Sequence, residues 1–179
     1  MRVLCFGDSN TYGYDPRSYF GDRYPAQTRW TDQLARNTGW DVMNFGVNGR
    51  SIPSQPVSLP EADTLIIMLG SNDLLCGCSA QEASLRMERF LLSVLNRYPN
   101  ILLIAPPPMQ YGDWVAEERL IRESSLLGTC YQSLAAQLGI GFADAGEWDV
   151  ALTFDGVHFS ESGHHAFSNG ILQALKQIT

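Results

Sequence analysis

The sequence lacks any hydrophobic run long enough to cross a membrane. No stretch approaches the ~20 consecutive apolar residues of a transmembrane helix. The apolar run at residues 3–6 is also shorter than the hydrophobic region of a secretory signal peptide. Because the sequence starts at Met1 without such a leader, we expect a cytoplasmic protein that does not insert into membranes.

Basic residues are scarce and unclustered. The chain has 12 Lys and Arg residues against 19 Asp and Glu residues, a formal net charge of −7. This charge repels phosphate backbones and anionic membrane surfaces, so nucleic acid and membrane partners are not expected. The first glycine-rich turn, residues 7–13 (GDSNTYG), has neither a G-x-G-x-x-G pattern nor the lysine of a P-loop. A small neutral or cationic substrate fits this composition better.

Only four cysteines are present, and they do not form a metal-binding pattern. Cys76 and Cys78 are the only close pair, and their C-x-C spacing differs from the C-x-x-C of zinc sites. No second pair and no neighbouring histidine complete a ligand set. We therefore expect reduced thiols and no metal site.

Short apolar runs alternate along the chain with longer amphipathic segments, without repeats or low-complexity tracts. With 179 residues, 45% of them hydrophobic, the chain fits a single domain over residues 1–179 with a full core. Predicted strands cover residues 2–6, 40–45, 64–69, 101–105 and 140–143. Predicted helices cover residues 29–38, 79–97 and 114–138, the last interrupted near Gly128, and a final helix starts at Ser160 or Glu161.

The predicted strand at residues 64–69 (TLIIML) indicates how the sheet is covered. It is apolar at almost every position, which is typical of a central parallel strand buried on both faces. Strands separated by helices predict a parallel sheet, and right-handed crossovers place helices on both sides of it. We therefore predict an α/β fold, a three-layer α/β/α sandwich. Such sheets bind ligands beyond the carboxyl ends of their strands.

Turns rich in small and polar residues follow three of these strands. They are residues 7–10 (GDSN), 44–49 (NFGVNG) and 70–73 (GSND), and residues 155–158 (DGVH) precede the last helix. Because the strands are parallel, the sheet would gather all four turns at one edge. The sequence therefore predicts one functional site built from these four turns.

The residue types in these turns support acyl transfer. A serine hydroxyl is a weak nucleophile until an imidazole takes its proton, and the imidazole needs a carboxylate to fix its tautomer. Ser9, His158 and Asp155 can fill these three roles. The developing oxyanion needs hydrogen-bond donors, which a glycine N–H and the amide of Asn72 can supply.

Each of these residues taken singly has a simpler structural interpretation. Ser9 could cap a helix, and Asp8 could hydrogen-bond its own turn. Gly46, Gly49 and Asn72 could each do no more than form a turn. These interpretations do not explain why all the residues occur together, in order, at strand ends. The G-x-S-x-G elbow of the α/β-hydrolases is absent, which argues against that class.

The motifs together resemble the SGNH hydrolase superfamily, also called GDSL esterases, and above all its arylesterase and acyltransferase branch. The resemblance covers nearly the whole chain, from residue 6 to the final helix. The matching blocks are residues 4–9 (LCFGDS), 29–31 (RWT), 66–73 (IIMLGSND), 105–108 (APPP), 144–146 (DAG) and 155–159 (DGVHF).

The resemblance implies roles for five residues. Ser9 would be the nucleophile, His158 the base, and Asp155 the carboxylate that orients the base. The backbone N–H groups of Ser9 and Gly49 and the side-chain amide of Asn72 would donate hydrogen bonds to the oxyanion.

Two positions leave the match open. Gly46 lies close before Gly49 and remains an alternative oxyanion donor. Asn10 stands where the family usually has leucine. We expect this exchange to alter the polarity of the pocket without abolishing the chemistry.

The family also implies a flavodoxin-like, five-stranded sheet of order 2-1-3-4-5, with no metal and no organic cofactor. It implies a serine esterase that hydrolyses short-chain carboxylic esters of small molecules through an acyl-enzyme, with acyl transfer to alcohols as a further activity. The alternatives are a carbohydrate O-deacetylase and a non-catalytic binding module on the same fold, and homo-oligomer formation is left open. The aromatic residues expected to line the pocket are Tyr12, Tyr14, Trp148 and Phe154.

Overall fold

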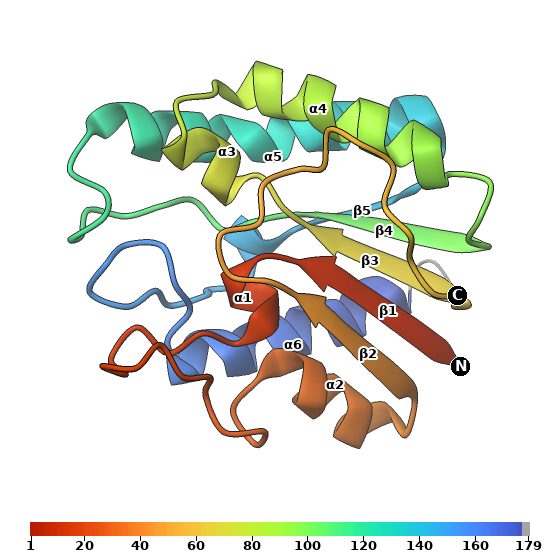
Figure 1. The fold of residues 1–179 in the computed structure, drawn as a ribbon, viewed down its shortest axis with the longest axis horizontal. Helices are drawn as coiled ribbons and strands as arrows, with labels where there is room; N and C mark the ends of the chain where they lie inside the picture. The colour runs from red at the N-terminus through yellow and green to blue at the C-terminus, as the bar shows by residue number, and fades with distance from the viewer. Residues whose placement is uncertain (177–179) are drawn as a thin grey trace.

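A parallel sheet of five strands forms the centre of the computed structural model, which describes residues 1–176 (Figure 1). The strand order is β2-β1-β3-β4-β5, and every neighbouring pair runs parallel. The predicted order 2-1-3-4-5 is confirmed, and so are the five predicted strands, with bounds that shift by one residue. The strands are β1 (Arg2–Gly7), β2 (Asp41–Gly46), β3 (Thr64–Met68), β4 (Asn100–Ala105) and β5 (Gly141–Asp144).

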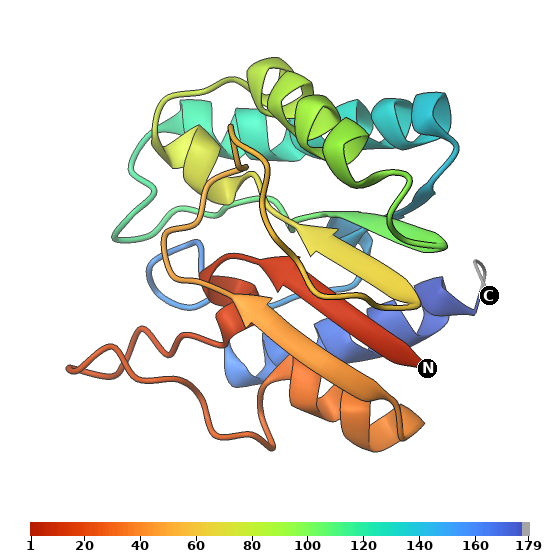
Figure 2. The ribbon, with the colours of Figure 1, turned by 45° about the vertical axis from the view of Figure 1, so that its right-hand side comes forward.

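Helices cover both faces of this sheet. They are α1 (Ser9–Tyr12), α2 (Trp30–Thr38), α3 (Ser71–Leu75), α4 (Ala80–Val94), α5 (Glu118–Leu138), the 3₁₀ turn η1 (Ala145–Glu147) and α6 (Glu161–Leu175). Helices α2 and α6 contact each other in one layer, and α3, α4 and α5 form the opposite layer (Figures 1 and 2). The predicted three-layer sandwich is therefore confirmed. Within residues 1–176, no helix is both long and apolar enough to cross a membrane.

Strand β3 shows how the core is divided between the two faces. Leu65 and Ile67 belong to the apolar cluster shared with α4 and α5. Ile66 and Met68 belong to the cluster shared with α2 and α6. Successive side chains of a strand point to opposite faces, so a strand covered on both sides must be apolar throughout. This explains the uninterrupted apolar run in the sequence.

Helix α5 differs from its prediction in two respects. It begins at Glu118 rather than Trp114, because the segment before it is held elsewhere: the Trp114 N–H donates to the carbonyl of Asp155, 3.1 Å away. It also continues through Gly128 without interruption. A Cβ at Gly128 would lie 2.5 Å from a carboxylate oxygen of Asp144, so this glycine permits close packing against the end of β5.

Two helices start where their capping residues predict. The Ser79 hydroxyl accepts a hydrogen bond from the Glu82 N–H, and the Glu82 carboxylate accepts one from the Ser79 N–H, which is a capping box. The Ser160 hydroxyl accepts from the Gly163 N–H. The last helix therefore starts at Glu161, with Ser160 as its cap.

All four cysteines are free thiols in the structure. Cys5 and Cys78 are buried, Cys130 is half-buried and Cys76 is exposed. Burial raises the pKa of the Cys5 thiol, so this sulfur stays protonated and acts as a small apolar group of the core.

Candidate active site

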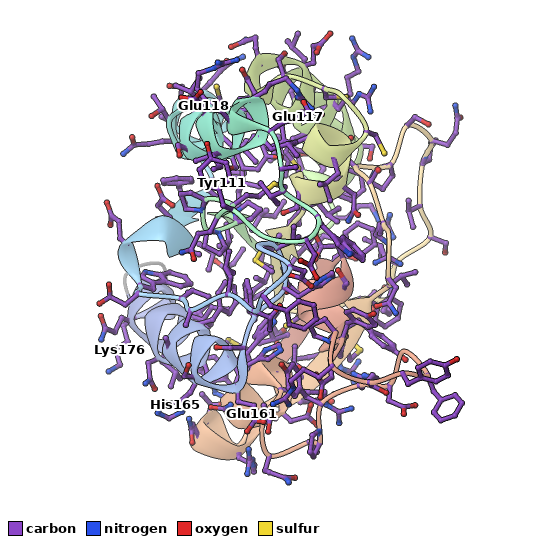
Figure 3. All side chains as sticks on the ribbon, turned by 90° about the vertical axis from the view of Figure 1, so that its left-hand side faces the viewer. Tyr111, Glu117, Glu118, Glu161, His165 and Lys176 are labelled. Carbon is purple, nitrogen blue, oxygen red and sulfur yellow. The ribbon has the colours of Figure 1, made fainter. Side chains whose placement is uncertain are left out.

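The polar turns found in the sequence meet at the carboxyl edge of the sheet. The arrowheads of β1, β2 and β3 point toward this edge in Figure 1, and Figure 3 views the molecule from that side. Glu117, before α5, and Glu161, at the start of α6, mark the two helical layers in that view. The turns after β1, β2 and β3 lie between these layers, as expected for a doubly wound sheet.

Ser9, His158 and Asp155 form one continuous chain of hydrogen bonds. The Ser9 Oγ lies 3.0 Å from Nε2 of His158, although 149 positions separate the two residues in sequence. The other ring nitrogen of His158, Nδ1, lies 2.7 Å from Oδ2 of Asp155. All three side chains are buried. The structure thus brings together the three residues that the sequence indicated, in the order hydroxyl, imidazole, carboxylate.

The Asp155 carboxylate is held by its own loop. Its Oδ1 accepts hydrogen bonds of 2.9 Å each from the N–H groups of Val157 and His158 and from the Thr153 hydroxyl. Burial raises the pKa of Asp155, but the hydrogen bonds from His158 and Val157 outweigh it and hold the pKa well below its usual range. The carboxylate is therefore ionised at neutral pH and can stabilise a charged imidazole.

Asp8, not Ser9, caps the helix that follows β1. Its Oδ1 accepts a hydrogen bond from the Asn10 N–H at 3.0 Å. The interpretation of Ser9 as a helix cap is therefore wrong, and Asp8 hydrogen-bonds its own turn. Burial raises the pKa of Asp8 to about 6, although this hydrogen bond and the nearby charges of His158 and Arg50 lower it. With Asp8 as the cap, the Ser9 hydroxyl is free to bond the imidazole.

The structure distinguishes between the two candidate glycines for the oxyanion. The Gly46 N–H already donates to Oδ1 of Asn44 at 2.9 Å. A Cβ at Gly46 would lie 2.0 Å from the backbone nitrogen of Tyr12, so Gly46 serves close packing. Gly49 has a φ of +73°, a conformation that favours glycine, and its N–H has no hydrogen-bond partner in the described part of the chain. This geometry favours Gly49 as the free donor.

Asn72 is tied to the loop that carries Gly49. It lies in the first turn of α3, and its Nδ2 donates to the carbonyl of Arg50 at 3.0 Å. An amide nitrogen carries two hydrogens, so the second stays available to a ligand. The next residue, Asp73, is buried and accepts a hydrogen bond from the Ile52 N–H at 2.9 Å. Helix α3 therefore holds this loop at two points.

Two aromatic rings from different loops contact the imidazole of His158. The ring of Tyr14 lies edge-on, with a centroid distance of 4.8 Å. The ring of Trp114 lies at 5.0 Å and is 53% exposed. The sequence indicated Tyr14 at this edge but not Trp114, whose position shortly after β4 is the signal that could have placed it there. Phe154, next to Asp155 in sequence, is 59% exposed, and its ring does not stack on His158 in the described part of the chain.

The prediction that Trp148 lines the pocket is wrong. Its ring packs against Phe167 of α6 at 5.2 Å, and a Cβ at Gly170 would lie 2.1 Å from it. It therefore covers the core on the α6 side. The ring of Tyr12 is covered by the guanidinium of Arg23, 4.4 Å from its centroid, so Tyr12 packs within its own loop.

The prediction that Asn10 sets the polarity of the pocket is also wrong. Asn10 is only 3% exposed, and both ends of its side chain are bonded inside the protein. Its Nδ2 donates to the carbonyl of Val157 at 3.1 Å, and its Oδ1 accepts from the N–H of Phe159 at 2.8 Å.

The arrangement has the parts that acyl transfer needs. A hydroxyl contacts an imidazole that contacts an ionised carboxylate, and free N–H donors lie in the neighbouring turns. Across the described range 1–176, no three His, Cys, Asp or Glu side chains gather closely enough to hold a metal ion.

The chain is similar to known proteins in both sequence and fold. Residues 5–166 match the sequence profile of the GDSL-like lipase/acylhydrolase family. The structure superposes on a proposed arylesterase from Agrobacterium tumefaciens strain C58, with a TM-score of 0.85, 30% identity and 99% of each chain covered. The aryl esterase of M. smegmatis gives 0.84, 27% and 99% of each chain. A carbohydrate acetylesterase from Sinorhizobium meliloti gives 0.84, 25% and 98% of each chain. No curated protein sequence matches the chain.

Proposed function

Because the chain belongs to the GDSL-like lipase/acylhydrolase family, we propose that it is a serine esterase that hydrolyses short-chain carboxylic esters through an acyl-enzyme. The observation that carries this proposal is the hydrogen-bonded chain of Ser9, His158 and Asp155. The aryl esterase and the carbohydrate acetylesterase with the same fold support ester hydrolysis as the reaction.

In the first half of the reaction, the Ser9 Oγ attacks the carbonyl carbon of the ester while Nε2 of His158 takes the hydroxyl proton. The ionised Asp155 stabilises the imidazolium that forms. The tetrahedral oxyanion receives hydrogen bonds from the N–H groups of Ser9 and Gly49 and from the second amide hydrogen of Asn72. His158 then returns its proton to the leaving alkoxide, the alcohol departs, and the acyl group stays on Ser9.

In the second half, water replaces the alcohol. His158 takes a proton from the water, and the resulting hydroxide attacks the acyl carbonyl carbon. The second tetrahedral intermediate collapses, Ser9 leaves with the proton held by His158, and the carboxylic acid is released. The enzyme returns to its starting protonation state, so no cofactor is consumed.

Acyl transfer is a further part of the proposal. An alcohol bound where the first alcohol left can attack the acyl-enzyme in place of water. The rings of Tyr14 and Trp114 beside His158 give this side of the site an apolar surface. Such a surface retains an alcohol and excludes water, which favours transfer.

A carbohydrate O-deacetylase is the second candidate. The carbohydrate acetylesterase from Sinorhizobium meliloti that shares the fold favours it. The half-exposed ring of Trp114 could stack on a sugar ring. The acetyl group of such a substrate is also a short acyl chain, as expected for the esters that this protein hydrolyses.

A hydrolysis screen tests the proposal and separates the two candidates. Purified protein and its Ser9→Ala variant would be assayed with p-nitrophenyl esters of increasing acyl length and with acetylated sugars. We expect hydrolysis of short acyl esters that is lost in the variant. A preference for acetylated sugars would favour the deacetylase over the esterase. If no ester is hydrolysed in a Ser9-dependent way, the remaining interpretation is a non-catalytic binding module.

Three sequence expectations stay predictions. They are a single domain over residues 1–179, of which 177–179 lie outside the described residues, a cytoplasmic location, and the formation of a homo-oligomer, which the sequence left open.

A further inference from the structure

Asn10 hydrogen-bonds the backbone on both sides of His158. Its side-chain nitrogen donates to the carbonyl of Val157, and its side-chain oxygen accepts from the N–H of Phe159. The two bonds, 3.1 and 2.8 Å long, fix the residues immediately before and after the imidazole. We infer that Asn10 is a positioning residue that holds the imidazole of His158 against the hydroxyl of Ser9. This inference rests on the proposed function of Ser9 and His158.

Asn10 is itself held rigidly beside the nucleophile. It follows Ser9 directly in α1 and is 3% exposed. Its backbone N–H donates to the carboxylate of Asp8, and its carbonyl accepts from Nε1 of Trp30 at 3.1 Å. The same short helical turn therefore carries both the Ser9 hydroxyl and the carboxamide that hydrogen-bonds residues 153–159, here called the histidine loop.

The histidine loop is otherwise attached to a different part of the fold. The N–H of Gln110 donates to the carbonyl of Gly156, and the N–H of Trp114 donates to the carbonyl of Asp155. These bonds fix the loop to the segment after β4 and not to α1. Apart from the Ser9–His158 bond, the two Asn10 bonds are the only hydrogen bonds between α1 and residues 153–159 within residues 1–176.

The geometry requires a carboxamide. One end must donate to a carbonyl while the other accepts from an N–H, which asparagine does with a single planar group. Leucine has a similar size but can do neither. An ionised aspartate would keep the bond from the Phe159 N–H and would place a second oxygen against the Val157 carbonyl. In the sequence Gly-Asp-Ser-Asn at residues 7–10, the proposed nucleophile Ser9 is thus followed directly by the residue that positions its base, His158.

The experiment compares Asn10→Leu and Asn10→Asp with Gln33→Leu as a matched control. Gln33 is also a buried carboxamide, 7% exposed, and both its ends are bonded, to the carbonyl of Thr28 and to Nδ1 of His165. Within residues 1–176, the Gln33 side chain makes no hydrogen bond to Ser9 or to residues 153–159. For each variant, kcat and KM on a p-nitrophenyl ester, the rate constant of Ser9 labelling by a fluorophosphonate and the melting temperature would be measured.

We expect Asn10→Leu to lower kcat and the labelling rate constant roughly 10- to 100-fold with KM nearly unchanged, because a misplaced base costs rate rather than binding. Asn10→Asp should fall between the wild type and Asn10→Leu. Gln33→Leu should lower the melting temperature by a similar amount and leave kcat of the folded protein unchanged. Equal kcat for Asn10→Leu and Gln33→Leu would overturn the inference. If Ser9→Ala keeps full activity in the same assay, the proposed function itself fails.

Discussion

The side-chain amide of Asn72 donates a hydrogen bond to the backbone carbonyl of Arg50, which directly follows Gly49. The bond is 3.0 Å long and joins the turn after β3 to the turn after β2. It fixes the plane of the amide, so the second N–H keeps one direction. The bond therefore links the two turns that carry the donors proposed for the oxyanion.

Asn72→Ala tests the contribution of this amide. An oxyanion donor acts mainly when charge develops, so we expect kcat to fall roughly 10²- to 10³-fold with little change in KM. Kinetics beside thermal melts provide the check. A variant that melts early but keeps kcat per folded molecule would show that Asn72 only closes the turn after β3.

Variants of the three hydrogen-bonded residues test the nucleophile, base and carboxylate. Ser9→Ala and His158→Ala should each lower ester hydrolysis by several orders of magnitude, because each removes a group that takes part in the proposed proton transfer and attack. Asp155→Asn should cost less, since nucleophile and base remain. A fluorophosphonate followed by peptide mapping should label Ser9 alone, and labelling of another serine would contradict the assignment.

The rate should fall as the pH is lowered, because a protonated His158 cannot accept the Ser9 proton. The pKa of Asp155 is held well below its usual range, so this carboxylate stays ionised over the same pH range and does not contribute to the fall. A pH profile of kcat/KM for wild type should therefore decline on the acid side. A flat profile through neutral and weakly acid pH would argue against a histidine base.

Asp8→Asn should stabilise the protein at neutral pH. Burial raises the pKa of Asp8 to about 6, above its ordinary value near 3.9, so the folded state holds this proton more tightly than the unfolded state. The free energy of unfolding therefore falls as pH rises from about 4 to about 6, by at most about 3 kcal/mol. Asparagine keeps the cap on the Asn10 N–H without the charge.

Denaturation at several pH values checks the Asp8 prediction. The gain of Asp8→Asn over wild type should appear between pH 4 and 6 and level off above that range. Asp41→Asn is the matched control, because its carboxylate is paired with Arg2 at the surface. An equal gain for Asp8→Asn at pH 3.5 and pH 7 would show that the buried charge is not the cause.

Trp114→Ala tests the acyl-transfer proposal. With vinyl acetate and benzyl alcohol in buffer, we expect wild type to form benzyl acetate as well as acetate. Loss of the ring beside His158 should lower the ratio of benzyl acetate to acetate several-fold, because water enters more readily.

Tyr111→Ala is the control for Trp114→Ala. Tyr111 lies on the same loop, is 68% exposed and is labelled in Figure 3 on the edge that holds the site. Its removal should leave the product ratio unchanged. If wild type makes only acetate even at high alcohol concentration, the protein is a plain esterase.

Much of the fold follows from local patterns in the sequence. The apolar strands with capped helices between them require a parallel sheet buried on both faces, because no other arrangement covers both sides of residues 64–69. The carboxyl ends of parallel strands share one edge, so Ser9 and Asn72 had to lie near each other. The spacing of Asp155 and His158 was enough to expect the bond between them, because a tight turn spans it.

Contacts between distant segments were decided only by the tertiary structure. Trp114 and Trp148 both follow strands, yet one lies against His158 and the other against Phe167. Nothing local separates them, because the choice depends on which loop crosses the edge of the sheet.

The same limit applies to the short motifs around the site. The sequence does not distinguish Gly46 from Gly49 as an oxyanion donor. The structure shows that the Gly46 N–H already donates to the Asn44 side chain, which favours Gly49 as the free donor. The sequence suggested that Asn10 alters the polarity of the pocket, but its hydrogen-bond partners lie about 150 positions away along the chain. A sequence motif specifies which groups are present, whereas the hydrogen-bond partners of a buried polar group are set by the segments that fold against it.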